Sequence, residues 1–259
     1  NDGSSDGAIT QNIVTVAGEF QNDAAMNVYD TLTVYADGDL TNNNAIAATT
    51  VDNYGDITNN TATSTLTANN LTNSGDITNK GTTTVYGTAL NGADATITNE
   101  NAFLATTLEN YGDFTNKGEG STLKANTVTN SGDIINEGTA TVYGTTTNGD
   151  NATITNKKDF NTTTLDNYGT FTNEGANSSL IANTIQNQAG ASIANDGTAT
   201  AYTYYEYQGA GTTNFYIRLT NTPSYLNGTM SELENSGMSL IVAVIKNATI
   251  SSEDRIELE

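Results

Sequence analysis

The stretch Asn53-Tyr54-Gly55-Asp56-Ile57-Thr58-Asn59 contains the motif that decides the fold of this chain. Its centre is a bulky apolar residue two places before an Asn, usually preceded by Gly. The motif occurs nine times, with a weaker tenth copy, and its apolar residues are Phe20, Leu40, Ile57, Ile77, Ile97, Phe114, Ile134, Ile154, Phe171 and, in the weak copy, Ile193. Their spacings are 20, 17, 20, 20, 17, 20, 20, 17 and 22 residues. A repeat of about 20 residues with one short strand-like segment in each is typical of a solenoid.

The spacings also recur in groups of three, so a second period of 57 residues runs through the chain. Within each coil, apolar and polar residues alternate. Because side chains of a strand point to its two faces in turn, we expect Leu71 and Ile77 to point inward and Asp76 to point outward. The pair Asn69-Asn70 interrupts this alternation, which predicts a corner.

Asn recurs at fixed places in the repeat, which predicts two columns of inward-pointing Asn side chains. Amides stacked at the strand spacing can donate to and accept from the next coil, which satisfies buried polar groups along the axis. A role in ligand binding is the alternative to this structural role. The first predicted column is Asn22, Asn42, Asn59, Asn79, Asn99, Asn116, Asn136, Asn156 and Asn173. The second is Asn53, Asn73, Asn110, Asn130, Asn167 and Asn187.

Composition excludes several classes of function. The chain has 259 residues and a formal net charge of −21, with only eight Lys and Arg residues. Such a surface repels nucleic acid and anionic membranes, so we expect neither as a partner. The sequence has no Cys and no His, which rules out disulfides, thiol catalysis and imidazole bases. No run of about 18 apolar residues occurs, so we expect no insertion into a membrane.

These patterns predict an all-β fold, a right-handed parallel β-solenoid (β-helix) of about ten coils with a β-rich C-terminal segment. We expect the solenoid and an N-terminal strand in residues 1–199, and a C-terminal cap or assembly segment in residues 200–259. At about 4.8 Å per coil the rod is roughly 45–50 Å long. An uncovered end of such a rod is a strand edge with which another chain can pair.

The repeats at residues 53–59 and 73–79 resemble those of bacterial autotransporter passengers and filamentous-haemagglutinin-type surface adhesins. The resemblance covers residue 14 to about residue 200. It implies a right-handed parallel β-helix, secretion, an extracellular or cell-surface location, and binding to host cells, matrix, glycans or like molecules. Residues 200–259 do not resemble the membrane barrel that follows a passenger in that family.

Both ends of the predicted rod bear on assembly. Residues 238–245 form the most hydrophobic stretch of the chain, and their β-branched content predicts a buried strand. The first coil has no recognisable cap, so we expect molecules to join head to tail by strand addition, which generates a filament when the contact does not close. The alternative is that the C-terminal strands cap their own last coil. The predicted assembly residues are Val14, Val16, Phe20, Leu240, Ile241, Val242, Val244 and Ile245.

An acidic column is the one candidate for metal binding. Asp39, Asp56 and Asp76 occupy equivalent places in three successive coils and should face outward about 5 Å apart. Calcium bridging by their oxygens is one interpretation. The other, which we favour, is a solvated acidic stripe that discourages lateral aggregation. We expect no other cofactor.

Three outward Tyr residues share one place in the 57-residue period, namely Tyr54, Tyr111 and Tyr168. They are candidates for spaced platforms on which sugars stack. The alternative interpretation, which we favour, is that they cover neighbouring loops.

Catalysis is not expected, and we predict no catalytic residues. The only Arg residues, Arg218 and Arg255, lie outside the repeat. The Asp residues recur with the coil, whereas a catalytic site departs from a repeat. We therefore expect a non-enzymatic extracellular structural subunit that joins head to tail into a surface fibre. A rod-like adhesin that binds host cells, matrix or glycans is the alternative, and a polysaccharide-active β-helix enzyme is the least favoured.

Overall fold

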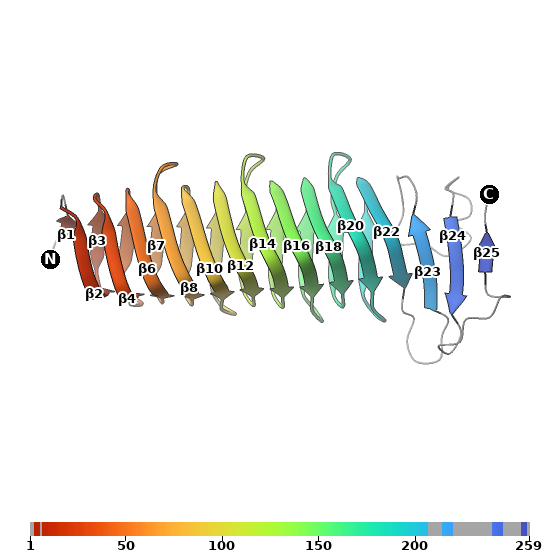
Figure 1. The fold of residues 1–259 in the computed structure, drawn as a ribbon, viewed down its shortest axis with the longest axis horizontal. Helices are drawn as coiled ribbons and strands as arrows, with labels where there is room; N and C mark the ends of the chain where they lie inside the picture. The colour runs from red at the N-terminus through yellow and green to blue at the C-terminus, as the bar shows by residue number, and fades with distance from the viewer. Residues whose placement is uncertain (1–2, 6, 207–213, 220–239, 246–254, 258–259) are drawn as a thin grey trace.

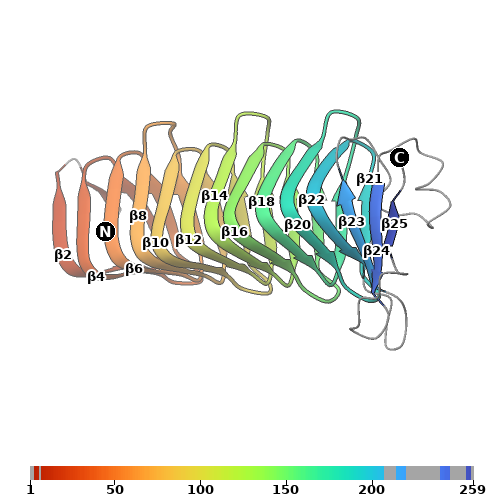
Figure 2. The same cartoon turned by 45° about the vertical axis from the view of Figure 1, so that its right-hand side comes forward.

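The computed structural model is a rod of stacked β-coils (Figure 1), and a second view shows the strands of each coil wrapping around the axis (Figure 2). It describes residues 3–5, 7–206, 214–219, 240–245 and 255–257. Short and long strands alternate along the chain, and each kind forms its own sheet. No helix occurs in these described residues.

The short strands form a sheet of 11 strands that is parallel throughout. They are β1 (Gly3–Ser5), β3 (Glu19–Asn22), β5 (Asp39–Asn42), β7 (Asp56–Asn59), β9 (Asp76–Asn79), β11 (Thr96–Asn99), β13 (Asp113–Asn116), β15 (Asp133–Asn136), β17 (Thr153–Asn156), β19 (Thr170–Asn173) and β21 (Ser192–Asn195).

The long strands form a second sheet of 14 strands, parallel as far as its eleventh strand. The parallel strands are β2 (Ile9–Val16), β4 (Met26–Val34), β6 (Ala45–Asn53), β8 (Thr65–Asn73), β10 (Thr82–Asn91), β12 (Ala102–Asn110), β14 (Thr122–Asn130), β16 (Thr139–Asn148), β18 (Asp159–Asn167), β20 (Ser179–Asn187) and β22 (Thr198–Glu206). The remaining three are β23 (Asn214–Leu219), β24 (Leu240–Ile245) and β25 (Arg255–Glu257).

Equivalent residues of successive coils lie side by side in each sheet. Ile57 pairs with Ile77, and Ile77 pairs with Ile97, so the apolar residues of the motif form one column. These side chains are buried, whereas Asp76 between them in sequence is exposed, as the alternation predicts. The structure therefore confirms the predicted all-β parallel solenoid of about ten coils.

A thin apolar core runs along the rod as one continuous cluster. Within it, Phe103 packs edge-on against Phe114 with 5.3 Å between ring centres, and Phe160 packs in the same way against Phe171 at 5.5 Å. Edge-on aromatic pairs contribute about 0.5–1.5 kcal/mol beyond the area that they bury. The two pairs are 57 residues apart, so the longer period of the sequence extends into the core.

The long strands bend without ending. In β8 the consecutive residues Asn69 and Asn70 are both exposed, with buried residues before and after them. The predicted corner at Asn69-Asn70 is therefore wrong, because the alternation breaks while the strand continues through the bend. At the equivalent place three other strands carry a register shift, at Tyr29 in β4, Tyr86 in β10 and Tyr143 in β16. A β-bulge of this kind bends its strand and re-aims a side chain.

Three corner loops project from the rod, as Figure 2 shows before β8, β14 and β20. They comprise residues 60–64, 117–121 and 174–178, again 57 residues apart. Each ends at a Ser whose hydroxyl donates to the backbone carbonyl three residues earlier, at 2.7 or 2.8 Å. The long period thus also sets the outline of the rod.

The C-terminal strands extend the long sheet beyond the last parallel coil. β23 pairs antiparallel with β22, β24 with β23, and β25 with β24. In this arrangement they follow their own last coil, which is the capping alternative. The expected boundary between residues 199 and 200 falls inside β22, and much of the 200–259 segment lies outside the described residues.

Close stacking of corners predicts a specific requirement for Gly. A Cβ atom on Gly75 would collide with the carbonyl oxygen of Gly55 in the preceding coil. We expect Gly75→Ala to lower the free energy of unfolding by about 1–3 kcal/mol, because backbone atoms must move apart. Urea unfolding followed by circular dichroism measures this change.

The control is Gly120→Ala, at a loop position where a Cβ atom meets no atom within 4 Å. Its effect should stay within about 0.5 kcal/mol. Equal effects at Gly75 and Gly120 would contradict the close approach of the corners.

Candidate functional site

The buried Asn side chains form two hydrogen-bonded ladders that run along the rod. In both, the side-chain Nδ2 of one Asn donates to the Oδ1 of the Asn in the next coil. The donor–acceptor distances are 2.7–2.8 Å in the ladder from Asn22 to Asn195. They are 2.7–2.9 Å in the ladder from Asn53 to Asn187. The predicted columns are thus present and structural.

Two members of the second ladder escaped the sequence reasoning. Asn91 and Asn148 occupy the ladder positions between Asn73 and Asn110 and between Asn130 and Asn167. They end the ten-residue strands β10 and β16, where a bulge and a longer corner shift the spacing from the motif. The signal that could have found them is the 57-residue interval between them.

Each ladder has a first member whose amide oxygen is buried without a hydrogen-bond partner, Asn22 in one and Asn53 in the other. The register places Val34 before Asn53, and Val16 before Val34. Neither Val carries an amide that could donate. The second ladder therefore starts only in the third coil, and the N-terminal end of the rod differs chemically from its middle.

The ladders predict a strong cost for removing an interior amide. Asn116 accepts from Asn99 at 2.7 Å and donates to Asn136 at 2.8 Å. We expect Asn116→Ala to lower the free energy of unfolding by about 2–5 kcal/mol, because it leaves one buried donor and one buried acceptor without a partner. Chemical denaturation is the measurement.

Asn22→Ala is the matched control at the end of the same ladder. It removes an amide whose own oxygen has no partner, and Asn42 keeps a second donor, the backbone N–H of Asn44 at 3.3 Å. The loss should be clearly smaller, about 1 kcal/mol. A loss at Asn22 as large as that at Asn116 would refute this account of the ladder.

The predicted assembly residues lie at opposite ends of the rod (Figure 1). At the N-terminal end Val16 is buried, while Val14 and Phe20 are partly buried against the core. The strand β2 is paired on one edge only, with β4, and no other described strand covers its second edge. This edge is eight residues long and includes Ile13, which is 59% exposed.

At the C-terminal end the five other assembly residues, Leu240, Ile241, Val242, Val244 and Ile245, form β24. Its backbone is paired with β23 on one side and with β25 on the other. Because both edges are used within the chain, β24 does not offer a free edge here. Among the described strands, the open edge at this end belongs to β25.

The acidic column is a straight row on the outer face of the short sheet. Asp39 pairs with Asp56, and Asp56 pairs with Asp76, while Glu19 precedes the row in register. All four side chains are exposed. In the described part of the chain, no group of three or more Asp, Glu, His or Cys residues is gathered so that it could hold a metal ion. Calcium binding by the row stays a prediction.

The middle carboxylate of the row carries the electrostatic strain. Burial raises the pKa of Asp56 above 3.8, and the charges of Asp76 and Asp39 raise it further. Since the folded-state pKa lies above the unfolded value, this group favours folding when it is protonated, below about pH 4. That contribution is lost as the pH rises through the folded-state pKa.

We therefore expect Asp56→Asn to be more stable than the wild type at pH 7, by a few tenths of a kcal/mol after solvent screening. The difference should vanish near pH 3, where the wild-type carboxyl is neutral. Urea unfolding at both pH values measures it, and added salt should shrink the difference at pH 7. A variant that is less stable at pH 7 would contradict the repulsion.

The outer face of the long sheet carries a second row of Tyr residues that the sequence reasoning did not single out. Tyr29, Tyr86 and Tyr143 stand at the three bulges, 57 residues apart, and all are exposed. The carbonyl oxygen of each accepts a hydrogen bond from a Thr of the next coil, at 2.5–2.7 Å. The bulges are thereby held in one geometry.

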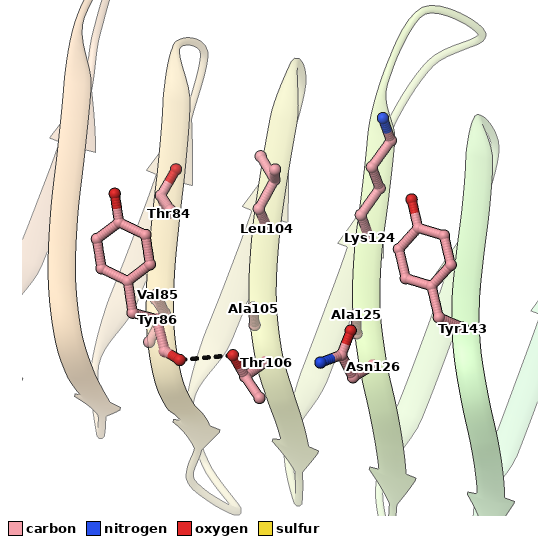
Figure 3. Close-up of a pocket in the computed structure, with 10 residues that line it drawn as sticks. All are labelled: Thr84, Val85, Tyr86, Leu104, Ala105, Thr106, Lys124, Ala125, Asn126 and Tyr143. Carbon is pink, nitrogen blue, oxygen red and sulfur yellow. Dashed lines mark hydrogen bonds between the residues drawn. The ribbon is translucent and has the colours of Figure 1, made fainter.

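A hollow of about 380 Å³ lies between Tyr86 and Tyr143 (Figure 3). Its volume falls within the range of small-molecule sites, which starts at about 300 Å³. The floor is formed by β12 and β14, and the lining residues are Thr84, Val85, Tyr86, Leu104, Ala105, Thr106, Lys124, Ala125, Asn126 and Tyr143. The hollow therefore combines aromatic, aliphatic, amide, hydroxyl and ammonium groups.

The Tyr residues considered from the sequence lie elsewhere. Tyr54, Tyr111 and Tyr168 follow the ends of β6, β12 and β18 at a corner of the rod, and each is about half exposed. None of the three lines the hollow. Their role as sugar platforms or as loop covers stays a prediction.

Comparisons with protein-family models, with curated proteins and with solved structures found no match. In the residues that the structure describes, no helix is long and apolar enough to cross a membrane. Arguments about function therefore start from the rod, its ends and its two outer faces.

Proposed function

We propose that this protein is a non-enzymatic, extracellular structural rod whose molecules associate head to tail into a surface fibre. The observation that carries the proposal is the uncovered edge of β2 at one end of a regular parallel stack. An exposed strand edge presents unpaired backbone donors and acceptors that pair readily with another chain. The repeats, which resemble those of autotransporter passengers and haemagglutinin-type adhesins, support the location outside the cell.

The two ends of the rod differ, so contact between them is heterologous. Such a contact generates an open filament when it does not close into a ring. The C-terminal partner for β2 is the far end of the long sheet, where β25 is the outermost described strand. In this form of the proposal β24 lies one strand inside the contact and supports it, rather than leaving its own chain.

Lateral contact is opposed by charge, which favours growth along the axis. The net charge of −21 and the exposed row at Asp39, Asp56 and Asp76 repel a second rod lying alongside. The ends of the rod instead present partly apolar surface, such as Val14 and Phe20. Association should therefore become stronger in salt, which screens the repulsion.

A charge on the open edge should block growth. We expect Ile13→Lys to shorten or abolish filaments, because Lys on an edge strand discourages pairing with another chain. Ile13 is 59% exposed, so the substitution leaves the core intact. Negative-stain electron microscopy gives the filament lengths, and sedimentation gives the size in solution.

Ile181→Lys is the control, since Ile181 is 44% exposed on β20 in the middle of the rod. It should leave the filaments unchanged. A wild-type protein that stays monomeric at high concentration would overturn the proposal. So would filaments of the same length in Ile13→Lys and in the wild type.

A second candidate function is a rod-like adhesin that presents a binding face. The specific observation in its favour is the row of exposed Tyr residues on the long sheet, with the hollow between Tyr86 and Tyr143. A polysaccharide-active enzyme is the least supported alternative, because the acidic residues follow the repeat.

A further inference from the structure

The hollow on the long sheet has the shape of a short slot bounded by two aromatic rings. Tyr86 on β10 and Tyr143 on β16 are three strands apart, which corresponds to about 14 Å. In Figure 3 both rings are seen face-on and extend in the same direction along their strands. They are 66% and 61% exposed, so their faces are open to a ligand. The slot suits an elongated ligand with flat apolar faces.

The floor of the slot alternates between apolar and hydrogen-bonding groups. Leu104 lies beside Lys124 in one row, and Thr106 lies near Asn126 in the next. The backbone of this sheet is already paired from strand to strand, so it cannot take up a peptide by strand addition. Recognition here depends on side chains alone, which favours a ligand rich in hydroxyl groups.

Lys124 supplies an unpaired positive charge at this slot. Of the five Lys residues in the described chain, Lys117 and Lys157 pair with Glu residues at 2.9 and 3.6 Å, and Lys158 donates to a backbone carbonyl at 2.7 Å. Lys124 has no such partner among the described side chains, and its chain extends beside Tyr143 in Figure 3. On a protein of net charge −21, a free ammonium group between two aromatic rings marks a place for an anion.

We infer that this slot binds a short linear oligosaccharide containing one acidic sugar. The apolar faces of its rings stack on Tyr86 and Tyr143, and its carboxylate pairs with Lys124. The hydroxyl groups bond to Thr106 and Asn126. A polyanionic chain does not fit, because the net charge of −21 repels it outside the slot. The inference deepens the second candidate function, the adhesin, and does not depend on fibre assembly.

The neighbouring slot in the same row provides an internal comparison. Between Tyr29 and Tyr86, the places of Leu104 and Lys124 are taken by Ala47 and Thr67. That slot has the aromatic rings without the positive charge. The acidic sugar is therefore assigned to the slot between Tyr86 and Tyr143 only.

Binding of sialylated and uronic-acid oligosaccharides, with their neutral counterparts, tests the inference on an array and by calorimetry. We expect Tyr143→Ala to weaken acidic ligands about tenfold. Lys124→Gln should weaken them about threefold to fivefold and leave neutral ligands unchanged. The matched controls are Tyr29→Ala, from the neighbouring slot, and Lys80→Gln, which removes a Lys outside the hollow. Both controls should bind acidic oligosaccharides as the wild type does.

Each outcome separates the site from the function. Glycan binding that survives both Tyr143→Ala and Lys124→Gln overturns this site and leaves the adhesin function standing. Equal loss with Lys80→Gln overturns the role of Lys124, since a general charge effect then explains it. A wild type that binds no oligosaccharide overturns the inference. Attachment of the wild type to cells stripped of glycans would in that case retain the adhesin function, and its absence would remove both.

Discussion

The structure depends on one constraint, the need of every buried Asn amide for a partner in the next coil. An unpaired amide in the core costs about 1–3 kcal/mol, so each coil must return its Asn to within hydrogen-bonding distance of the previous one. The ladders achieve this at 2.7–2.9 Å over the length of the rod. The register of both sheets follows, because a slip by one residue would turn the Asn and Ile side chains of a strand outward.

The ladders leave the length of the corners free, and the 57-residue period occupies that freedom. Coils of 17 and 20 residues both restore the Asn column, as Asn42 to Asn59 and Asn59 to Asn79 show. The additional residues form projecting loops such as 117–121 and bulges such as that at Tyr86. Regular packing inside thus coexists with a patterned exterior, where binding is expected.

Charge and edges act on the rod in different directions. The exposed carboxylates of one face, with Asp56 held at a raised pKa by burial and by its neighbours, oppose contact along the sides. The uncovered edge of β2 favours contact at one end. A rod that repels laterally and pairs axially is suited to linear assembly, and the slot beside Lys124 lies on a side that stays accessible in such a fibre.

Sequence periodicity alone determined the stacked β-coils, the inward Ile and Asn columns and the outward Asp row, because strand alternation and a fixed repeat length specify which side chains stack. It did not reveal Asn91 and Asn148, since bulges shift their spacing. It also placed a corner at Asn69-Asn70, where the strand continues. Only the tertiary structure showed that β24 is paired on both sides and that Tyr86, Lys124 and Tyr143 share one hollow. These features join residues from different coils or from beyond the repeat, and they depend on the bending of strands and on strand order, which a one-dimensional period does not contain.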